Sequence, residues 1–309
     1  MTLDIRDLTK SFGSKQVLDG VTFQAAAGFA LGLLGRNGAG KTTTIRIIMQ
    51  VFPPDGGSVL LDGKPLRDCD VRIGYLPEEK GLYPKQKVRD QMVYLARLRG
   101  MRASTARKAV QAWVERMELT AYIDKKLETL SKGNQQKIQL ALALLHEPDV
   151  VILDEPFSGL DPVNAQLLKT IVKEQVSQGR IVLFSSHQMN YVEQFCDAVA
   201  ILHHGKIQIS GTIRDLKRAY DRTRLRLRFA DGNQSCIQFA YLYEQIPELK
   251  EMVAHFEPLA DDCLIQLYHA EQRSMLFQEL AKAECDLDQF QVVEPSLEEI
   301  FVDKVGDGV

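Results

Sequence analysis

The sequence contains few cysteines, and no stretch of it is apolar over the length of a membrane span. Its five cysteines are scattered over 309 residues and form no C-x-x-C pair, which excludes a disulfide-rich secreted scaffold. No uninterrupted apolar run approaches the roughly 20 residues that a membrane-spanning helix needs, and residues 1–6 lack the apolar core of a signal peptide. We therefore expect a reduced, cytosolic compartment, with any membrane association made through a partner.

The chain also lacks an excess of charge of either sign. Lysine and arginine number 38 and aspartate and glutamate 41, for a formal net charge of −3, so bulk attraction to nucleic acid or to anionic lipid is not expected. Hydrophobic residues make up 45% and charged residues 26% of the chain, which is typical of a soluble globular protein with a sizeable core. The length predicts one large domain or two ordinary ones.

The most informative motif that is present spans residues 35–42, which read Gly-Arg-Asn-Gly-Ala-Gly-Lys-Thr. This is a G-x-x-x-x-G-K-[ST] phosphate-binding loop, and it lies between an apolar stretch at 29–34 and a segment at 43–48 that can form a helix. The glycines let backbone N–H groups turn inward around a phosphate, and the helix N-terminus adds positive partial charge. The motif predicts that Lys41 reaches the β- and γ-phosphates of a nucleotide and that Thr42 offers its hydroxyl to Mg²⁺.

Two adjacent acids follow an apolar strand further along the chain. Residues 150–153 are Val-Val-Ile-Leu, and they lead directly into Asp154 and Glu155. We expect Asp154 to hold Mg²⁺ through water and Glu155 to take a proton from the water that attacks the γ-phosphate. Acids at strand ends also serve as helix caps, and it is the upstream phosphate loop that favours the catalytic interpretation.

The order of the expected elements indicates a parallel sheet with helices on its faces. Short strands are expected up to residue 76 and helices from about 88 to 147, followed by a strand at 150–153, a helix at 163–176 and a strand at 180–185. Alternating strands and helices around a phosphate loop are typical of an α/β core. A mostly helical insert interrupts that core.

Three further segments, in this order along the chain, extend the pattern. They are Leu-Ser-Lys-Gly-Asn-Gln-Gln-Lys at 130–137, Phe-Ser-Gly-Leu-Asp-Pro at 157–162 and Ser-Ser-His at 185–187. Together with the phosphate loop, they resemble the nucleotide-binding subunit of an ATP-binding cassette (ABC) transporter over roughly residues 1–220. The resemblance implies an α/β P-loop cassette with a parallel core sheet, an N-terminal antiparallel β subdomain and a helical subdomain at about 80–148. It also implies ATP and Mg²⁺ as ligands.

The same resemblance implies roles for individual residues. Phe12 would stack on adenine, although an aromatic residue beside a strand can also belong to the core. His187 would contact the γ-phosphate and orient the attacking water, and Asp161 would lie in a loop at a dimer interface. The phosphate cradle would comprise Gly35, Asn37, Gly38, Ala39, Gly40, Lys41, Thr42 and Thr43. In the family, the signature loop, here Ser131, Gly133 and Asn134, binds the ATP held by a second ATPase subunit.

The sequence departs from the family pattern at two sites. The signature usually reads Leu-Ser-Gly-Gly-Gln, whereas Lys132 and Asn134 replace its first glycine and its glutamine here; because Ser131 and Gly133 are kept, we expect the loop to work. Glu78 stands where the family usually has a glutamine near Mg²⁺. Our hypothesis is that Glu78 binds the metal directly or through water, and the alternative is that it turns to solvent when ATP is absent.

The resemblance also implies a membrane-spanning permease as partner. In the family, the region after Glu78 borders a groove that receives a helix of the membrane subunit, and Leu82 and Tyr83 are our candidates for that contact. Ordinary packing of this loop against the helical insert is an equal alternative. A permease partner would place the chain in the cytoplasm, peripheral to the inner face of the cell membrane.

The segment 221–309 is expected to form a small α+β accessory domain without a nucleotide motif. We expect two short strands around an Asp-Gly-Asn turn at 231–233, then helix, strands, helix, strand and helix. The ending at 294–303 resembles the C-terminal extension of bacterial cassette ATPases that serve multidrug, sodium or antibiotic exporters. The domain is either dimer-stabilising or regulatory, or it is a passive appendage.

The sequence thus predicts an ATPase that forms an ATP-sandwich dimer and powers a separate permease for export. The alternative is a soluble cassette ATPase acting on ribosomes or nucleic acid. Relatives of that kind usually carry two cassettes with a charged linker or a long coiled-coil insertion, which this chain lacks, so no nucleic acid partner is expected. The signature loop and the Ser-Ser-His segment are out of place in a P-loop kinase or a switch GTPase.

Overall fold

The chain folds into two compact units. In the computed structural model, the described residues are 1–79, 81–157, 161–220, 222–230 and 234–305. The first unit comprises Met1–Ile213 together with the end of the chain from Phe301, and the second comprises Arg214–Ile300. The continuous N-terminal part of the first unit therefore ends at Ile213, before the boundary that the sequence predicts at residue 220. Within the described residues, no helix is both long enough and apolar enough to cross a bilayer.

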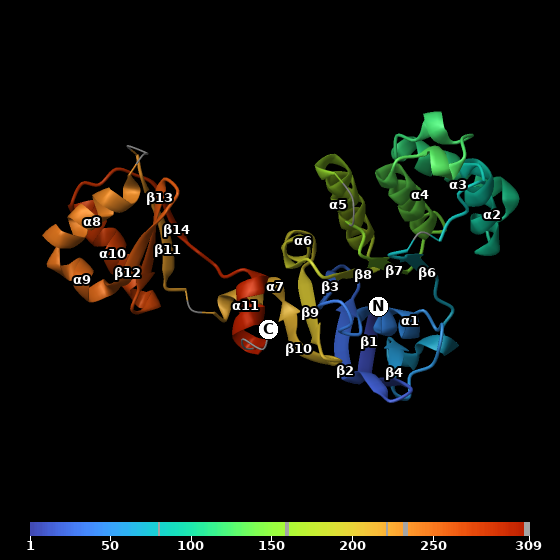
Figure 1. The fold of residues 1–309 in the computed structure, drawn as a ribbon, viewed down its shortest axis with the longest axis horizontal. Coiled ribbons are helices and arrows are strands. Elements are labelled where there is room, and N and C mark those ends of the chain that lie inside the picture. The colour runs from blue at the N-terminus through green and yellow to red at the C-terminus, as the bar shows by residue number, and fades with distance from the viewer. Residues whose placement is uncertain (80, 158–160, 221, 231–233, 306–309) are drawn as a thin grey trace. The chain divides into compact units, whose positions relative to one another are not determined.

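The N-terminal strands of the first unit form an antiparallel sheet. Its strand order is β2-β1-β4-β5 (Figure 1). The strands are β1 (Thr2–Phe12), β2 (Lys15–Ala26), β4 (Gly56–Leu61) and β5 (Lys64–Pro65). Alternate residues are buried at the start of β1 and at the end of β2, as the pleat of a sheet with one covered face requires.

A six-stranded sheet of order β10-β9-β3-β8-β7-β6 packs against the first one through a shared core. All neighbours are parallel except β10, which runs antiparallel to β9. The strands are β3 (Ala30–Leu34), β6 (Ile73–Leu76), β7 (Val150–Asp154), β8 (Ile181–Ser186), β9 (Ala198–His203) and β10 (Lys206–Thr212). This sheet confirms the predicted α/β class. The strands β3, β7 and β8 are apolar runs because both of their faces are covered.

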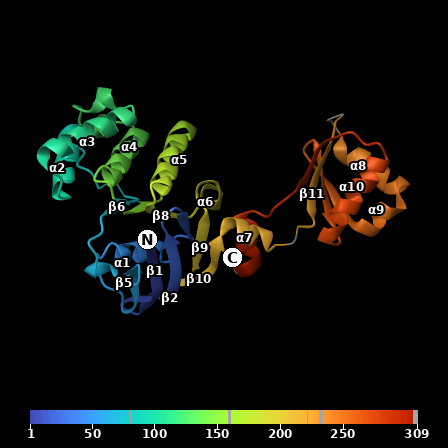
Figure 2. The same cartoon turned by 180° about the vertical axis from the view of Figure 1, so that it is seen from behind.

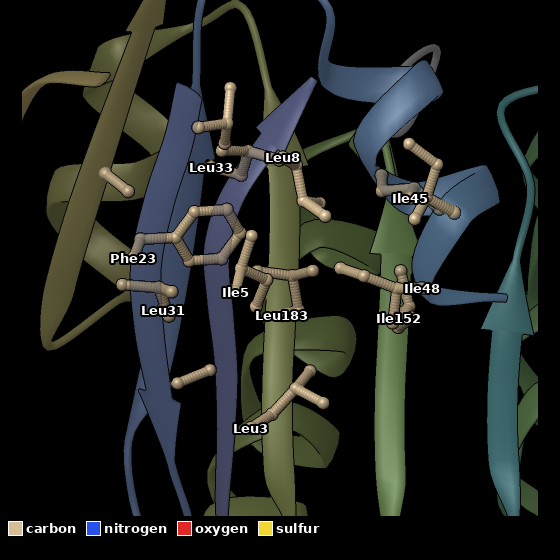
Figure 3. Close-up of a cluster of buried hydrophobic side chains, with 14 of the residues drawn as sticks. Leu3, Ile5, Leu8, Phe23, Leu31, Leu33, Ile45, Ile48, Ile152 and Leu183 are labelled. Atoms are coloured by element: carbon tan, nitrogen blue, oxygen red, sulfur yellow. The ribbon is translucent and has the colours of Figure 1, made fainter. Parts of the chain in front are cut away.

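The main core lies between the two sheets and the first helix (Figure 3). Each fully buried Leu, Ile or Phe side chain stabilises the fold by about 1.5–3 kcal/mol. The labelled residues are Leu3, Ile5, Leu8, Phe23, Leu31, Leu33, Ile45, Ile48, Ile152 and Leu183, all of them 5% exposed or less. The helices that flank the parallel sheet are α1 (Lys41–Ile48), α5 (Pro162–Ser177) and α6 (Met189–Phe195).

The predicted helical insert forms three helices beyond the β6 edge of the sheet (Figure 2). They are α2 (Val88–Leu98), α3 (Ala103–Arg116) and α4 (Lys132–Leu144), joined by short 3₁₀ turns at Thr120–Tyr122 and Leu127–Thr129. The strand β6 packs so closely on α4 that a Cβ at Gly74 would lie 2.2 Å from the carbonyl oxygen of Ala143. Only glycine permits this approach, which fixes α4 against the sheet edge.

The second unit is an antiparallel sheet covered by helices. Its strand order is β12-β13-β11-β14, with β11 (Arg224–Phe229), β12 (Val253–Leu259), β13 (Asp262–Leu267) and β14 (Leu287–Val292). Its helices are α8 (Ser235–Gln245), α9 (Pro247–Met252) and α10 (Arg273–Lys282), with a 3₁₀ turn at Ala270–Gln272. The helix α7 (Ile213–Arg218) begins at the boundary between the units, and α11 (Leu297–Val305) ends the described chain.

One expectation for this unit was wrong. A strand was predicted after the turn at 231–233, but residues 235–245 form the helix α8; the turn itself lies outside the described residues. The segment is rich in aromatic residues, which favour strands. Phe239 is instead fully buried against the core of the sheet, edge-on to Phe256 at 5.2 Å, so tertiary packing overrode the local preference.

Candidate functional site

The glycine loop at 35–40 has the backbone of a ligand cradle. Gly38 and Gly40 have φ angles of 82° and 113°, a region that side chains rarely adopt. At Gly40 a Cβ would also lie 2.6 Å from Leu18 Cδ2. Lys41 opens α1 directly after this loop, and its Nζ donates to the carbonyl oxygen of Gly35 at 2.6 Å. The loop therefore holds the Lys41 side chain in place through a carbonyl group of its own backbone.

A cavity of about 360 Å³ opens at this loop. It brings together residues from four parts of the chain: β2, the loop with α1, the segment after β6, and the end of β7. The predicted residues that line it are Asn37, Gly38, Gly40, Lys41, Thr42, Thr43, Glu78, Asp154 and Glu155. Lys15 and Val17 of β2 also line it. Sequence reasoning missed these two because no motif marks them and only the β1–β2 hairpin carries them to the loop.

The acids lie at the carboxyl edge of the parallel sheet. Asp154 ends β7 in register with Ser185 of β8, so the residues that follow both strands meet there. Glu155 is 6% exposed. Its carboxylate accepts a hydrogen bond from His187 Nδ1 at 2.7 Å and one from Ser186 Oγ at 3.2 Å. His187, which does not line the cavity, is thus tied to it through Glu155.

The charges at the cavity are not balanced within the chain. Burial lowers the pKa of Lys41, against the opposing effect of Glu155, Asp154 and Glu78. Burial raises the pKa of Asp154, and the charges of Glu78 and Glu155 raise it further. Burial and the nearby Asp154 also raise the pKa of Tyr75 to about 12. Three carboxylates thus line the cavity with two ammonium groups, Lys15 and Lys41, and burial disfavours the charged forms of Lys41 and Asp154.

This donor set fits a bound Mg²⁺ ion together with phosphate oxygens. Thr42, Asp154 and Glu78 all line the same cavity. Among the described residues, no group of three or more His, Cys, Asp or Glu side chains is placed to hold a metal by itself. Mg²⁺ does not require such a group, because it usually keeps several waters and binds one or two carboxylates plus substrate phosphates. A cation here would also offset the carboxylate excess.

The signature loop lies apart from the cavity. Ser131 caps α4, and its Oγ accepts the N–H of Asn134 at 3.3 Å. Asp161 caps α5 in the same way, accepting the N–H of Asn164 at 2.9 Å. In the part of the chain that is described, no hydrogen bond or ion pair joins Ser131, Gly133 or Asn134 to the glycine loop, and none of the three lines the cavity.

Other predicted residues also lie outside the cavity lining. Phe12 is half-exposed and packs edge-on against Phe52 at 5.6 Å. It pairs across the hairpin with Lys15, which itself lines the cavity. Gly35 and Ala39 belong to the loop but do not line the cavity: Ala39 is buried, and a Cβ at Gly35 would lie 2.5 Å from Leu202 O. Both shape the cradle rather than its open side.

The loop after Glu78 presents an exposed tyrosine. Tyr83 is 54% exposed, whereas Leu82 is partly buried. The buried side chain of Gln91 holds this loop from α2: its Oε1 accepts the N–H of Tyr83 at 3.2 Å, and its Nε2 donates to the carbonyl oxygens of Tyr83 and Gln86 at 3.4 Å. Gln91 therefore fixes the backbone that carries the exposed tyrosine.

Comparison with known proteins assigns both units. Residues 18–158 match the family model described as ABC transporter, and residues 211–305 match the model described as ATP-binding protein DrrA1-3-like, C-terminal domain. An uncharacterized ABC transporter ATP-binding protein, YhaQ of Bacillus subtilis (strain 168), is 43% identical over 305 residues, which is 98% of each chain. The linearmycin resistance ATP-binding protein LnrL of the same organism is 30% identical over 309 residues, with the same coverage.

Two further matches cover the first unit. The Nod factor export ATP-binding protein I of Burkholderia lata (strain ATCC 17760 and its synonyms) is 36% identical over 208 residues, covering 66% of this chain and 68% of that protein. A solved ATP-binding subunit of an ABC transporter superposes with a TM-score of 0.64 at 31% identity, over 71% of this chain and 92% of that one. The chain belongs to the family of ABC transporter ATP-binding proteins and is an ATPase that binds ATP.

Proposed function

We propose that two such ATPase subunits close around shared ATP molecules and power a separate membrane permease, in the direction of export. The second subunit is either another copy of this chain or a sister cassette. The proposal places the chain in the cytoplasm, peripheral to the inner face of the membrane. Support for export comes from the relative whose name includes Nod factor export.

One observation supports the proposed dimer: the signature loop of the chain does not line the cavity at its own phosphate cradle. The cradle at Lys41 and the helix N-terminus at Ser131 belong to different parts of the first unit. A helix N-terminus with a free backbone N–H and a hydroxyl is suited to a phosphate. If Ser131, Gly133 and Asn134 serve the ATP of the partner subunit, each site is completed only when two chains meet.

Within one site, the chain's residues divide the work as follows. Lys41 and the N–H groups of residues 37–43 hold the β- and γ-phosphates, and Phe12 stacks on adenine beside Lys15 and Val17. Thr42, Asp154 and Glu78 hold Mg²⁺, which when bound neutralises charge that develops on the phosphates. Asp161 contributes to the dimer interface.

Proton transfer falls to Glu155. Its carboxylate takes a proton from the attacking water as general base. The Nδ1–H of His187 donates to this carboxylate at 2.7 Å, which leaves Nε2 of His187 available to face the γ-phosphate and the water. The hydrogen bonds from His187 and Ser186 hold the carboxylate in one orientation, so little reorganisation is needed at the moment of reaction.

The contact with the permease is proposed to centre on Tyr83. Its exposed ring, on a loop that Gln91 holds in place, follows Glu78 closely in sequence. A permease helix seated there would move with the segment that carries Glu78, which couples nucleotide contacts to the membrane subunit. Co-purification of the chain with a polytopic membrane protein, lost on Tyr83→Ala, tests this contact.

The dimer is tested by trapping it. Glu155→Gln keeps the side-chain shape and removes the base, so ATP should bind without being hydrolysed and hold the two subunits together. We expect a shift from monomer to dimer in sedimentation velocity on adding ATP with Mg²⁺, and none with ADP. Ser131→Ala in the same background should weaken the dimer. A Glu155→Gln chain that stays monomeric at saturating ATP contradicts the proposal.

A further inference from the structure

The helix that follows the signature loop makes a polar contact with the sheet. Gln136 lies in the second turn of α4, and its Nε2 donates to the carbonyl oxygen of Pro156 at 2.8 Å. The next residue of α4, Lys137, donates instead to Met117 O at 3.3 Å, within the helical subdomain. Gln136 therefore joins the helical subdomain to the segment directly after the end of β7.

That segment is held in an uncommon backbone conformation. Glu155 has a φ of 48°, a left-handed geometry that a non-glycine residue keeps only where its surroundings enforce it. Before the turn, the N–H of Glu155 donates to Ser185 O at 2.9 Å. After the turn, Gln136 binds the carbonyl of Pro156. The backbone on both sides of Glu155 is thus fixed, once by the neighbouring strand and once by α4.

We propose that Gln136 is a positioning residue for hydrolysis, which holds the turn after β7 so that the carboxylate of Glu155 stays aimed at the attacking water. The inference rests on the proposed function, in which Glu155 is the general base. If the turn relaxes, the carboxylate shifts relative to the fixed phosphate cradle, and a small displacement of a general base lowers the rate strongly.

The position of Gln136 on α4 adds a consequence for the dimer. The helix α4 begins at the Ser131 cap, and the proposed partner ATP binds at that end. The same helix carries Gln136 to the turn that presents Glu155 to the chain's own ATP. One rigid helix thereby connects the nucleotide of the partner subunit with the base of this chain, so occupation of one site favours the reactive geometry of the other.

The decisive experiment tests whether the hydrogen-bond donor of Gln136, and not the shape of its side chain, supports hydrolysis. Gln136→Ala and Gln136→Glu both lose the amide donor, and the second keeps the shape; Gln136→Lys restores a donor on a flexible stem. Gln111→Ala is the matched control, because Gln111 lies on α3 and its amide donates along its own helix, to Glu115 at 2.7 Å. The readouts are kcat and KM for ATP and the thermal midpoint of each variant.

We expect kcat to fall about tenfold in Gln136→Ala and Gln136→Glu, because the free energy of one hydrogen bond that positions the base is lost. KM should be nearly unchanged because the cradle is intact. Gln136→Lys should recover most of the rate, and Gln111→Ala should match the wild-type chain. An unchanged kcat in Gln136→Ala overturns the proposal. So does a Gln136→Lys chain no faster than Gln136→Ala. The Glu155→Gln dimer assay reports on the proposed function separately: if that dimer forms while Gln136→Ala keeps full activity, only the role of Gln136 fails.

Discussion

The two units treat buried carboxylates in opposite ways. In the first unit, Asp154 is 2% exposed beside Glu78 and Glu155, and burial raises its pKa. In the second unit, Asp262 is 1% exposed on the sheet, but it is paired with both Arg226 and Arg228. Hydrogen bonds from these arginines lower the pKa of Asp262, with Arg228 contributing most. The first carboxylate lacks sufficient counter-charge within the chain, and the second has two cations.

This contrast distinguishes a ligand-binding site from a purely structural ion pair. A buried charge without full compensation destabilises the ligand-free protein. Such charges are found at functional sites, where a bound ligand supplies the missing counter-charge. The first unit stores such an imbalance around its cavity, where Mg²⁺ and ATP fit. The second unit satisfies its charge internally, which is what structural stability alone requires. The comparison therefore places the chemistry in the first unit without reference to any motif.

The comparison is tested most strongly by removing Lys41, the buried cation of the cavity. Lys41→Met should lower ATP hydrolysis by about 100- to 1000-fold, because a preorganised positive group at the developing phosphate charge is lost. The thermal midpoint of the nucleotide-free chain should change little, since burial already disfavours the ammonium form. Steady-state hydrolysis and a thermal melt measure both effects. A loss of activity that merely tracks a collapse of the fold would contradict this interpretation.

A second test uses pH at a histidine that is buried in the first unit away from the cavity. His146 Nδ1 lies 3.3 Å from Arg99 Nη1, and Nε2 lies 3.3 Å from Ile73 O, a pattern that suits the neutral ring. Burial, followed by the charge of Arg99, lowers its pKa to about 4. Because the unfolded chain takes up this proton near pH 6.5, the stability is fully present above that pH. It is lost as the pH falls towards about 4, by an amount on the order of 2 to 3 kcal/mol.

Denaturant unfolding at several pH values between these limits measures the loss. His146→Gln keeps one donor and one acceptor but cannot be protonated, so its stability should vary less with pH over this window. If the wild-type chain and His146→Gln lose stability in parallel as the solution is acidified, His146 is not the group responsible.

The same substitution, aspartate to asparagine, can be made in both units, and it has the smallest expected effect on stability. Asp154→Asn removes a charge that its surroundings disfavour, so the thermal midpoint of the nucleotide-free chain should rise slightly while hydrolysis is lost. Asp262→Asn removes the partner of two arginines, so stability should fall by about 1 to 2 kcal/mol while hydrolysis per folded molecule is kept. Shifts of the same sign in the two variants would remove the distinction between the units.

Much of the site was readable from the sequence because its residues sit in short contiguous motifs. The loop at 35–42 fixes its own geometry through glycine φ angles, and a strand that ends in Asp154 and Glu155 delivers both acids to the edge of a parallel sheet. The expected strand at 235–245 failed for the opposite reason. Its aromatic residues favour a strand locally, but the buried position of Phe239 against the sheet decides for α8.

The sequence by itself determined the class of fold, the phosphate loop, the acidic pair and the signature loop, because each depends on spacing over a few residues. Only the tertiary structure decided that Lys15 and Val17 complete the cavity, that Phe12 lies beside it, and that Gln136 reaches the turn after Glu155. Those contacts join residues that are far apart in the chain or on different elements. Their formation depends on how sheets and helices pack, which no local pattern encodes.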